Sequence, residues 1–322
     1  MVYKGKFLKQ VIENDFDPTV STTYTWELSD QALAAIWLTV KGDLYGIDMC
    51  IDDFLAPLSS IDVWLGSFNV LHYATPLKAL IMNSKLKGAF PYLVASTQTA
   101  TYVTGVSFPI LFGAPYLNDK MCLPSSLSNR KKLTLTFSAD VTHLTDCLID
   151  ISEVIMIDAS PLGFIKQEEI GVESKGTGDH DLWLQTNWDL LKVLLYSPTV
   201  PSTTVYTSTI ERAGIEIDDL PFGYKGVPWE HLHAEMMDEL EGGTQTENHI
   251  HLAAGATSLT GMPSQYEHWI KNYGELDYFF EKDLKWRCPT AGASSAKLKY
   301  NAGVAEAWAL AVAEYVPTSK IS

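Results

Sequence analysis

The chain has 322 residues, of which 46% are hydrophobic, 11% aromatic and 19% charged. This composition excludes a disordered chain and supplies apolar material for one large core, or for two cores of about 150 residues each. The 39 acidic side chains outnumber the 23 basic ones, which gives a net charge of −16 and excludes binding to a nucleic-acid backbone as a main role.

In the first half of the chain, one helix is predicted to start near residue 75, where Thr75 can cap it and Pro76 takes the first helical position. Residues 132–138 alternate strictly between apolar and polar side chains, which is typical of a strand with one buried face. Short β-branched runs at 148–151 and 154–157 predict two further strands.

In the second half, strands are predicted over 203–210, 215–218 and 296–300, and a helix over 227–240. The apolar residues of this helix fall at helical spacing: Trp229, Leu232, Met236 and Leu240. Glycine and proline separate the strands along the whole chain. Many short strands with few helices favour antiparallel sandwiches over a βαβ sheet.

Six segments of the first half are matched, in the same order, by six segments of the second half, at a spacing of roughly 150 to 170 residues. The pairs are 33–40 with 188–195, 60–66 with 209–217, 75–82 with 227–240, 108–112 with 276–280, 133–137 with 298–300, and 151–155 with 312–316. This shared order indicates a duplicated β domain of single-domain size.

We therefore predict four parts in the chain. They are an N-terminal segment at 1–19, a first β domain at 20–160, a connection at 161–177 and a second β domain at 178–322. The connection is too short for a free tether, so we expect the two domains to pack side by side.

The sequence contains no GxSxG elbow, phosphate-binding loop, GxGxxG or HExxH motif. Adjacent acids such as Asp218 and Asp219 face opposite ways on a strand and are read as solvated turn carboxylates. We predict no catalytic, cofactor-binding or metal-binding residue.

Two HxH pairs, His231 with His233 and His249 with His251, leave metal binding as an open alternative. On a strand, such a pair places both imidazoles on one face, as in the metal sites of cupins. A helix through Trp229 would instead send His231 and His233 in different directions, and no second cupin box is visible. We interpret these histidines as surface or interface residues.

The cysteines and the N-terminus point to a cytoplasmic site of synthesis. Cys50, Cys122, Cys147 and Cys288 lie far apart, and we expect free, mostly buried thiols. The first residues are too polar for a secretion signal, and no apolar stretch approaches the roughly 18 residues of a membrane span. Lys4, Lys6 and Lys9, mixed with apolar residues, form either an amphipathic segment that rests on an anionic surface or a frayed terminus.

Residues 106–115, followed by 121–124 and 133–137, resemble a stretch of double jelly-roll major capsid proteins of tailless icosahedral viruses. In that family, apolar strands and a Leu-Pro corner precede a strongly alternating strand. Residues 277–280, 283–286 and 296–300 resemble the same passage in the second roll, and 307–312 its last strand. The resemblance covers most of residues 20–318.

This resemblance implies an all-β fold with a few short helices, built as two tandem antiparallel jelly rolls. It implies a non-enzymatic coat protein of a virus or phage, without cofactors, whose homotrimers form pseudo-hexagonal capsomers of an icosahedral shell. Its partners would be other copies, penton or minor capsid proteins, and an internal membrane contacted through the N-terminal segment, with no sequence-specific nucleic acid. It would be made in the host cytoplasm and end in the virion capsid.

Two other functions remain compatible with the residues. One is a tandem β-sandwich that binds carbohydrate through exposed tryptophan and tyrosine side chains. The other is a two-domain cupin-like metalloenzyme, which would use the HxH pairs.

Overall fold

A computed structural model describes residues 5–17, 20–44, 55–89, 91–95, 103–125, 130–139, 144–201, 206–238 and 270–321. The chain divides into two compact units, and the sequence passes from one to the other between Ile165 and Lys166. The closing residues 317–321 belong to the first unit. Within the described ranges, no helix is both long enough and apolar enough to cross a membrane.

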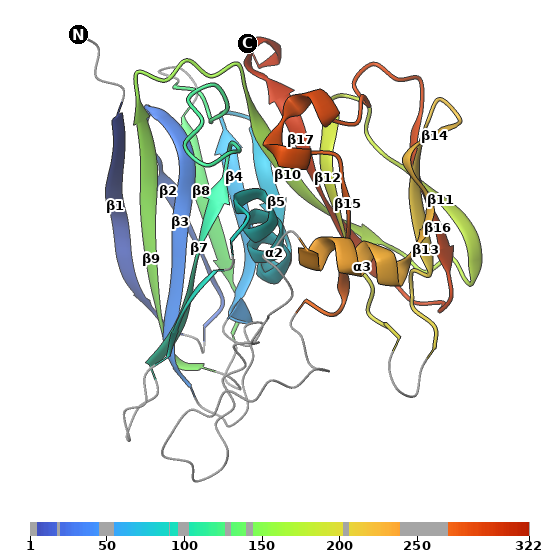
Figure 1. The fold of residues 1–322 in the computed structure, drawn as a ribbon. Helices are drawn as coiled ribbons and strands as arrows, with labels where there is room; N and C mark the ends of the chain where they lie inside the picture. Colours follow the sequence, from blue (N-terminus) through green and yellow to red (C-terminus); the bar gives the residue numbers. More distant parts are fainter. Residues whose placement is uncertain are drawn as a thin grey trace. The chain divides into compact units, whose positions relative to one another are not determined.

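The described residues of the first unit include two sheets and helix α2 (Figure 1). Its strands in chain order are β1 Gly5–Phe16, β2 Thr22–Glu27, β3 Ala32–Leu44, β4 Leu58–Leu65, β5 Phe68–Tyr73, β6 Tyr92–Ala95, β7 Val103–Leu111, β8 Lys131–Phe137 and β9 Leu144–Ile157. Helix α2, Pro76–Lys87, lies between β5 and β6. One sheet has the order β1-β9-β3-β7-β6, and the other contains β5-β4-β8-β2.

The second unit repeats this plan. Its strands are β10 Gly163–Val172, β11 Gly178–Trp183, β12 Asp189–Tyr196, β13 Arg212–Ile217, β14 Leu220–Pro228, β15 Tyr273–Asp277, β16 Ala296–Ala302 and β17 Trp308–Pro317. Helix α3, Trp229–Asp238, follows β14. Two short 3-10 helices, η1 Phe280–Lys282 and η2 Leu284–Trp286, follow β15. A third, η3 Thr318–Lys320, comes after β17 and belongs to the first unit. The orders are β15-β12-β17-β10 and β11-β16-β13-β14.

Both units have the same jelly-roll topology. When the described strands of each unit are counted along the chain, with the short β6 set aside, one sheet has the order first-eighth-third-sixth. The other sheet has the order second-seventh-fourth-fifth in both units. Pairs such as β3 with β9 and β12 with β17 run antiparallel. Two four-stranded antiparallel sheets wound in this way form a jelly roll.

The six sequence pairs all fall on equivalent elements, so the predicted duplication is confirmed. They lie on the third, fourth, sixth, seventh and eighth strands and on the helix between the fifth and sixth strands. The alternation that predicted them is also present. In β8, Leu133, Leu135 and Phe137 point into the core, while Lys132 is exposed. The same alternation recurs in β16, its partner in the second roll.

Several local expectations need correction. Residues 148–151 and 154–157 are parts of the single strand β9, because Ser152 and Glu153 continue its pairing with β3. Residues 206–210 are not a strand, and the Ser208 hydroxyl donates to the carbonyl of Ile210. Helix α2 does begin at Pro76, but the Thr75 hydroxyl does not cap it and accepts a hydrogen bond from Lys78 at 2.9 Å instead.

The two segments expected outside the rolls also contain strands. Residues 5–16, expected in a separate N-terminal segment, form β1, which pairs with β9 along its length. Strand β9 is 14 residues long and has two edges that can pair with a neighbouring strand. Strand β3 pairs along one edge, and β1 pairs along the other. Residues 163–172 of the expected connection form β10.

We predict that Gly113→Ala destabilises the first roll. A Cβ atom at this position would overlap the backbone carbonyl of Met121, so the segment after β7 must move. We expect the free energy of unfolding, measured by chemical denaturation, to fall by about 3 kcal/mol. Gly171→Ala is the matched control, because its Cβ would meet nothing within 4 Å. An equal effect of both substitutions would contradict this account of the packing.

Candidate assembly surfaces and a polar groove

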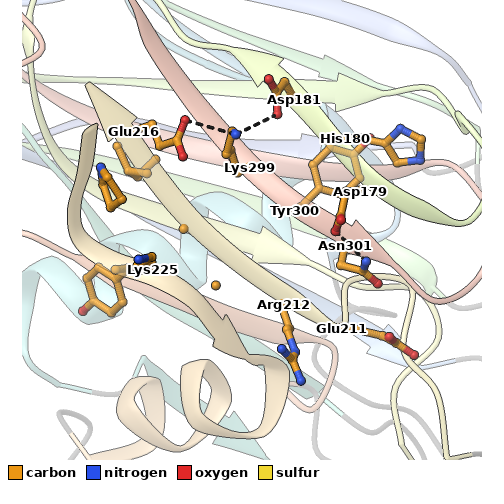
Figure 2. Close-up of a pocket in the computed structure, with 15 residues that line it drawn as sticks. Asp179, His180, Asp181, Glu211, Arg212, Glu216, Lys225, Lys299, Tyr300 and Asn301 are labelled. Atoms are coloured by element: carbon orange, nitrogen blue, oxygen red, sulfur yellow. Dashed lines mark hydrogen bonds and ion pairs between the residues drawn. The ribbon is translucent and has the colours of Figure 1, made fainter. Parts of the chain in front are cut away.

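A groove of about 550 Å³ runs over the outer face of sheet β11-β16-β13-β14 in the second roll (Figure 2). Its floor is set by strand register. One row of residues across β11, β16 and β13 consists of Asp181, Lys299 and Gly214. The next outward-facing row across the same strands consists of Asp179, Asn301 and Arg212. Because alternate residues of a strand share a face, the polar side chains of these rows project together.

One wall of the groove exists because β14 leaves the sheet. Its residues 223–226 lie opposite the single residue Gly214, since Phe222 pairs with Ile215 and Val227 pairs with Ala213. A Cβ on Gly214 would lie 2.7 Å from the carbonyl oxygen of Tyr224, so only glycine lets the excursion pass this closely. Gly223 and Gly226 turn the chain with positive φ angles of 68° and 59°.

Several charged side chains of the groove have a partner within it. Figure 2 shows Lys299 between two carboxylates, with its Nζ 3.2 Å from Glu216 and 4.0 Å from Asp181. The amide of Asn301 donates to Asp179 at 2.6 Å. Lys299 and Asp181 are about half exposed, and ion pairs of such side chains are weak and exchange readily with water. The groove is therefore a wet, polar surface, in which Lys299 lies between Glu216 and Asp181 while Asn301 holds Asp179.

Tyr224 anchors the excursion to the rest of the roll. Its hydroxyl donates to Glu235 of α3 at 2.7 Å and accepts from the backbone N–H of Asp277 at 3.0 Å. Burial raises the pKa of this phenol, and the nearby Glu235 carboxylate adds to the shift. The hydroxyl is therefore protonated at all physiological pH values and acts as a structural tie between β14, α3 and β15.

The histidine pairs do not form a metal site in the part of the chain that the structure covers. His231 and His233 lie on helix α3, where His231 is exposed and the Nδ1 of His233 lies 2.6 Å from the carbonyl oxygen of Tyr273. His249 and His251 lie outside the described residues. Among the described side chains, no group of three His, Cys, Asp or Glu residues is placed to hold a metal ion.

Cys122, Cys147 and Cys288 are buried and form no disulfide, as expected, while Cys50 lies outside the described residues. Burial raises the pKa of Cys122 to about 11 and that of Cys288 to about 12, with small contributions from nearby aspartates. These two thiols are therefore protonated near neutral pH and unsuited to nucleophilic chemistry.

Buried charge in the second roll is also structural. Lys166 lies 2.5 Å from Glu168 and 3.1 Å from Glu314. Burial raises the pKa of Glu314, and the ammonium of Lys166 opposes that shift. Burial lowers the pKa of Lys166, but the two carboxylates more than offset it. The three side chains satisfy one another inside the protein.

Exposed aromatic side chains are the other notable surface feature. Trp183 is 65% exposed at the end of β11, with the Nζ of Lys297 4.7 Å from its ring. Phe280 and Trp286 meet edge to face after β15, with ring centroids 6.5 Å apart. Exposed aromatic rings of this kind are typical of protein contact surfaces.

Solved structures that this chain resembles include major capsid proteins of viruses. The chain superimposes on the major capsid protein of Sulfolobus turreted icosahedral virus with a TM-score of 0.68 and 13% identity, covering 98% of both chains. Against the major capsid protein P2 of bacteriophage PM2, the TM-score is 0.65 at 8% identity, covering 97% of this chain and 98% of that one. A chain of the PBCV-1 virus capsid gives a TM-score of 0.60 at 8% identity, with 98% and 94% covered.

At these identities, the likeness establishes the fold: the chain is a double jelly roll of the kind found in major capsid proteins of icosahedral viruses. No family model matches the sequence. No curated protein matches it either.

We predict that Tyr224→Phe destabilises the second roll by about 2 kcal/mol, because it leaves a buried backbone N–H and a carboxylate without their partner. Tyr206→Phe is the control, since Tyr206 is 87% exposed. Chemical denaturation of both variants measures the difference. Equal stability of the two variants would show that the Tyr224 hydroxyl does not tie the excursion down.

Proposed function

We propose that the chain is a structural major capsid protein whose homotrimers form pseudo-hexagonal building blocks of an icosahedral shell. The observation that carries this proposal is the complete jelly-roll topology present twice in one chain, with a likeness to capsid proteins of three viruses over nearly the whole chain. Identities of 8% to 13% mean that the architecture is shared while the sequence is not.

Symmetry explains why a duplicated roll suits this role. Three copies of a two-roll chain present six similar rolls, so a three-fold ring acquires a nearly six-sided outline. In such a ring, the contact between copies is heterologous, with one surface of each copy meeting a different surface of the next. A six-sided block tiles a surface without gaps, which is what a shell requires.

The proposal has no catalytic step and no cofactor. It assigns the protein to the virion capsid, after synthesis in the host cytoplasm, with neighbouring capsomers and penton or minor capsid proteins as further partners. Lys9, exposed on β1, supports a contact of the N-terminal segment with an anionic surface such as an internal membrane.

The mass of the purified chain in solution tests the proposal. Sedimentation should give about 107 kDa, three times the 35.7 kDa of one chain, and negative-stain images should show six-sided particles. A particle that stays monomeric at concentrations in the micromolar range, with no six-sided outline, would contradict the proposed function.

A further inference from the structure

The helices of the two rolls occupy equivalent positions but differ in burial. In α2, every residue from Pro76 to Leu86 is buried. In α3, Trp229, Leu232 and Met236 are buried, whereas Glu230, His231 and Ala234 are exposed. These exposed residues stand at positions i, i+1 and i+4, so they form one stripe along the helix. We call this stripe the open face of α3.

For the equivalent sheets the order of burial is reversed, because the sheet of the second roll is more deeply buried than that of the first. In the second roll, Leu190–Leu195 of β12 are all buried, and so are Ala311 and Ala313 of the neighbouring β17. In the first roll, β3 is buried from Ala32 to Ile36 and alternates after that, with Leu38 and Val40 buried and the residues between them partly exposed. The partly exposed residues form the open face of the first sheet: Trp37, Thr39, Lys41, Ser107, Asp150 and Ser152.

From this reciprocal pattern, we propose that the open face of α3 in one copy docks on the open face of the first sheet in a second copy. The inference rests on the proposed function and names the surfaces that hold the trimer together. In a ring of two-roll chains, the second roll of one copy lies beside the first roll of the next, so the half-exposed helix meets the half-exposed sheet.

Three properties of the open sheet face suit a helix as its occupant. Its side chains are held in place by contacts with each other, with Thr39 hydrogen-bonded to Ser107 at 2.7 Å and Lys41 paired with Asp150 at 2.6 Å. Its side chains are only partly exposed, which leaves room for a helix to approach the sheet. Trp37 supplies a large apolar surface, and its indole N–H is already satisfied by Tyr116 at 3.2 Å.

The charges of the two faces are complementary. Lys6, Lys41 and Lys87 surround the open sheet face, with Lys87 Nζ 4.6 Å from the Trp37 ring and Lys6 Nζ 5.6 Å from the Tyr116 ring. Against these three cations stands Asp150. The exposed stripe of α3 carries Glu230 and no lysine or arginine. In a chain of net charge −16, a locally basic surface favours an acidic partner segment over random contact.

Helix α3 is also rigidly held on its own roll, as a docking element must be. Gly274 of β15 lets it approach closely, since a Cβ there would lie 3.2 Å from the Cβ of Leu232. Glu235 is tied to Tyr224, and His233 contacts the carbonyl of Tyr273. Pre-organisation of this kind lowers the entropy lost when the surface is buried.

Cross-linking between two differently tagged copies of the full chain tests the proposal. One copy carries Ala234→Cys and the other Thr39→Cys, and the co-expressed, purified particle is treated with a short bismaleimide. We expect a cross-linked pair of chains that requires both substitutions. The unsubstituted chain measures background from the native cysteines, and Ala307→Cys, at an exposed loop residue of the second roll, replaces Ala234→Cys in the control pair.

Trimers whose 234–39 pair cross-links no better than the 307–39 pair would overturn this inference and leave the proposed function standing. An unsubstituted chain that sediments as a monomer would instead overturn the proposed function itself.

A second variant measures the same contact without cysteine chemistry. Ala234→Arg places a bulky cation in the stripe that should meet a basic surface. We therefore expect the dissociation constant of the trimer to rise at least about tenfold. Ala307→Arg should change the dissociation constant by less than about twofold. Equal dissociation constants for these two variants would contradict docking through α3.

Discussion

The structure depends on one constraint: each four-stranded sheet must bury one face against the other sheet of its own roll. Strict alternation along β8 and β16 satisfies this constraint, because every second side chain enters the core. The same constraint fixes strand register, since a shift by one residue would turn the apolar set outward. The differences in burial and charge between the two rolls therefore lie on the faces that point away from the two cores.

Those remaining faces differ between the rolls in a way that fits assembly. The outer face of β11-β16-β13 carries paired charges and a wet groove, whereas the outer face of β3 and β9 carries half-buried polar residues around Trp37. The second roll buries the outer residues of β12 and β17, and the first buries its helix from Pro76 to Leu86. Two copies of one fold thus present unlike surfaces, which is what a head-to-tail ring requires.

Much of this fold was predictable from the sequence. The order of the six repeated segments gave the duplication, and helical spacing through Trp229, Leu232 and Met236 gave α3. The strand β1 was missed because Lys6 and Lys9 read as an amphipathic terminus, and only the long partner β9 shows that an edge was free. The groove was missed as well, because it depends on an excursion of β14 over Gly214, and the register of distant strands is not visible in local periodicity. The open faces follow from comparing burial between rolls, which no single segment reveals.

The central claim is that the twin rolls exist to form a closed ring of three chains. A reconstruction of the purified particle by cryo-electron microscopy, at a resolution that separates helices from sheets, tests this claim most directly. The account predicts six jelly rolls in a ring, first and second rolls alternating, with each α3 covered by the first sheet of the adjacent chain. A particle of two rolls, or a ring in which α3 faces solvent on every copy, would contradict it.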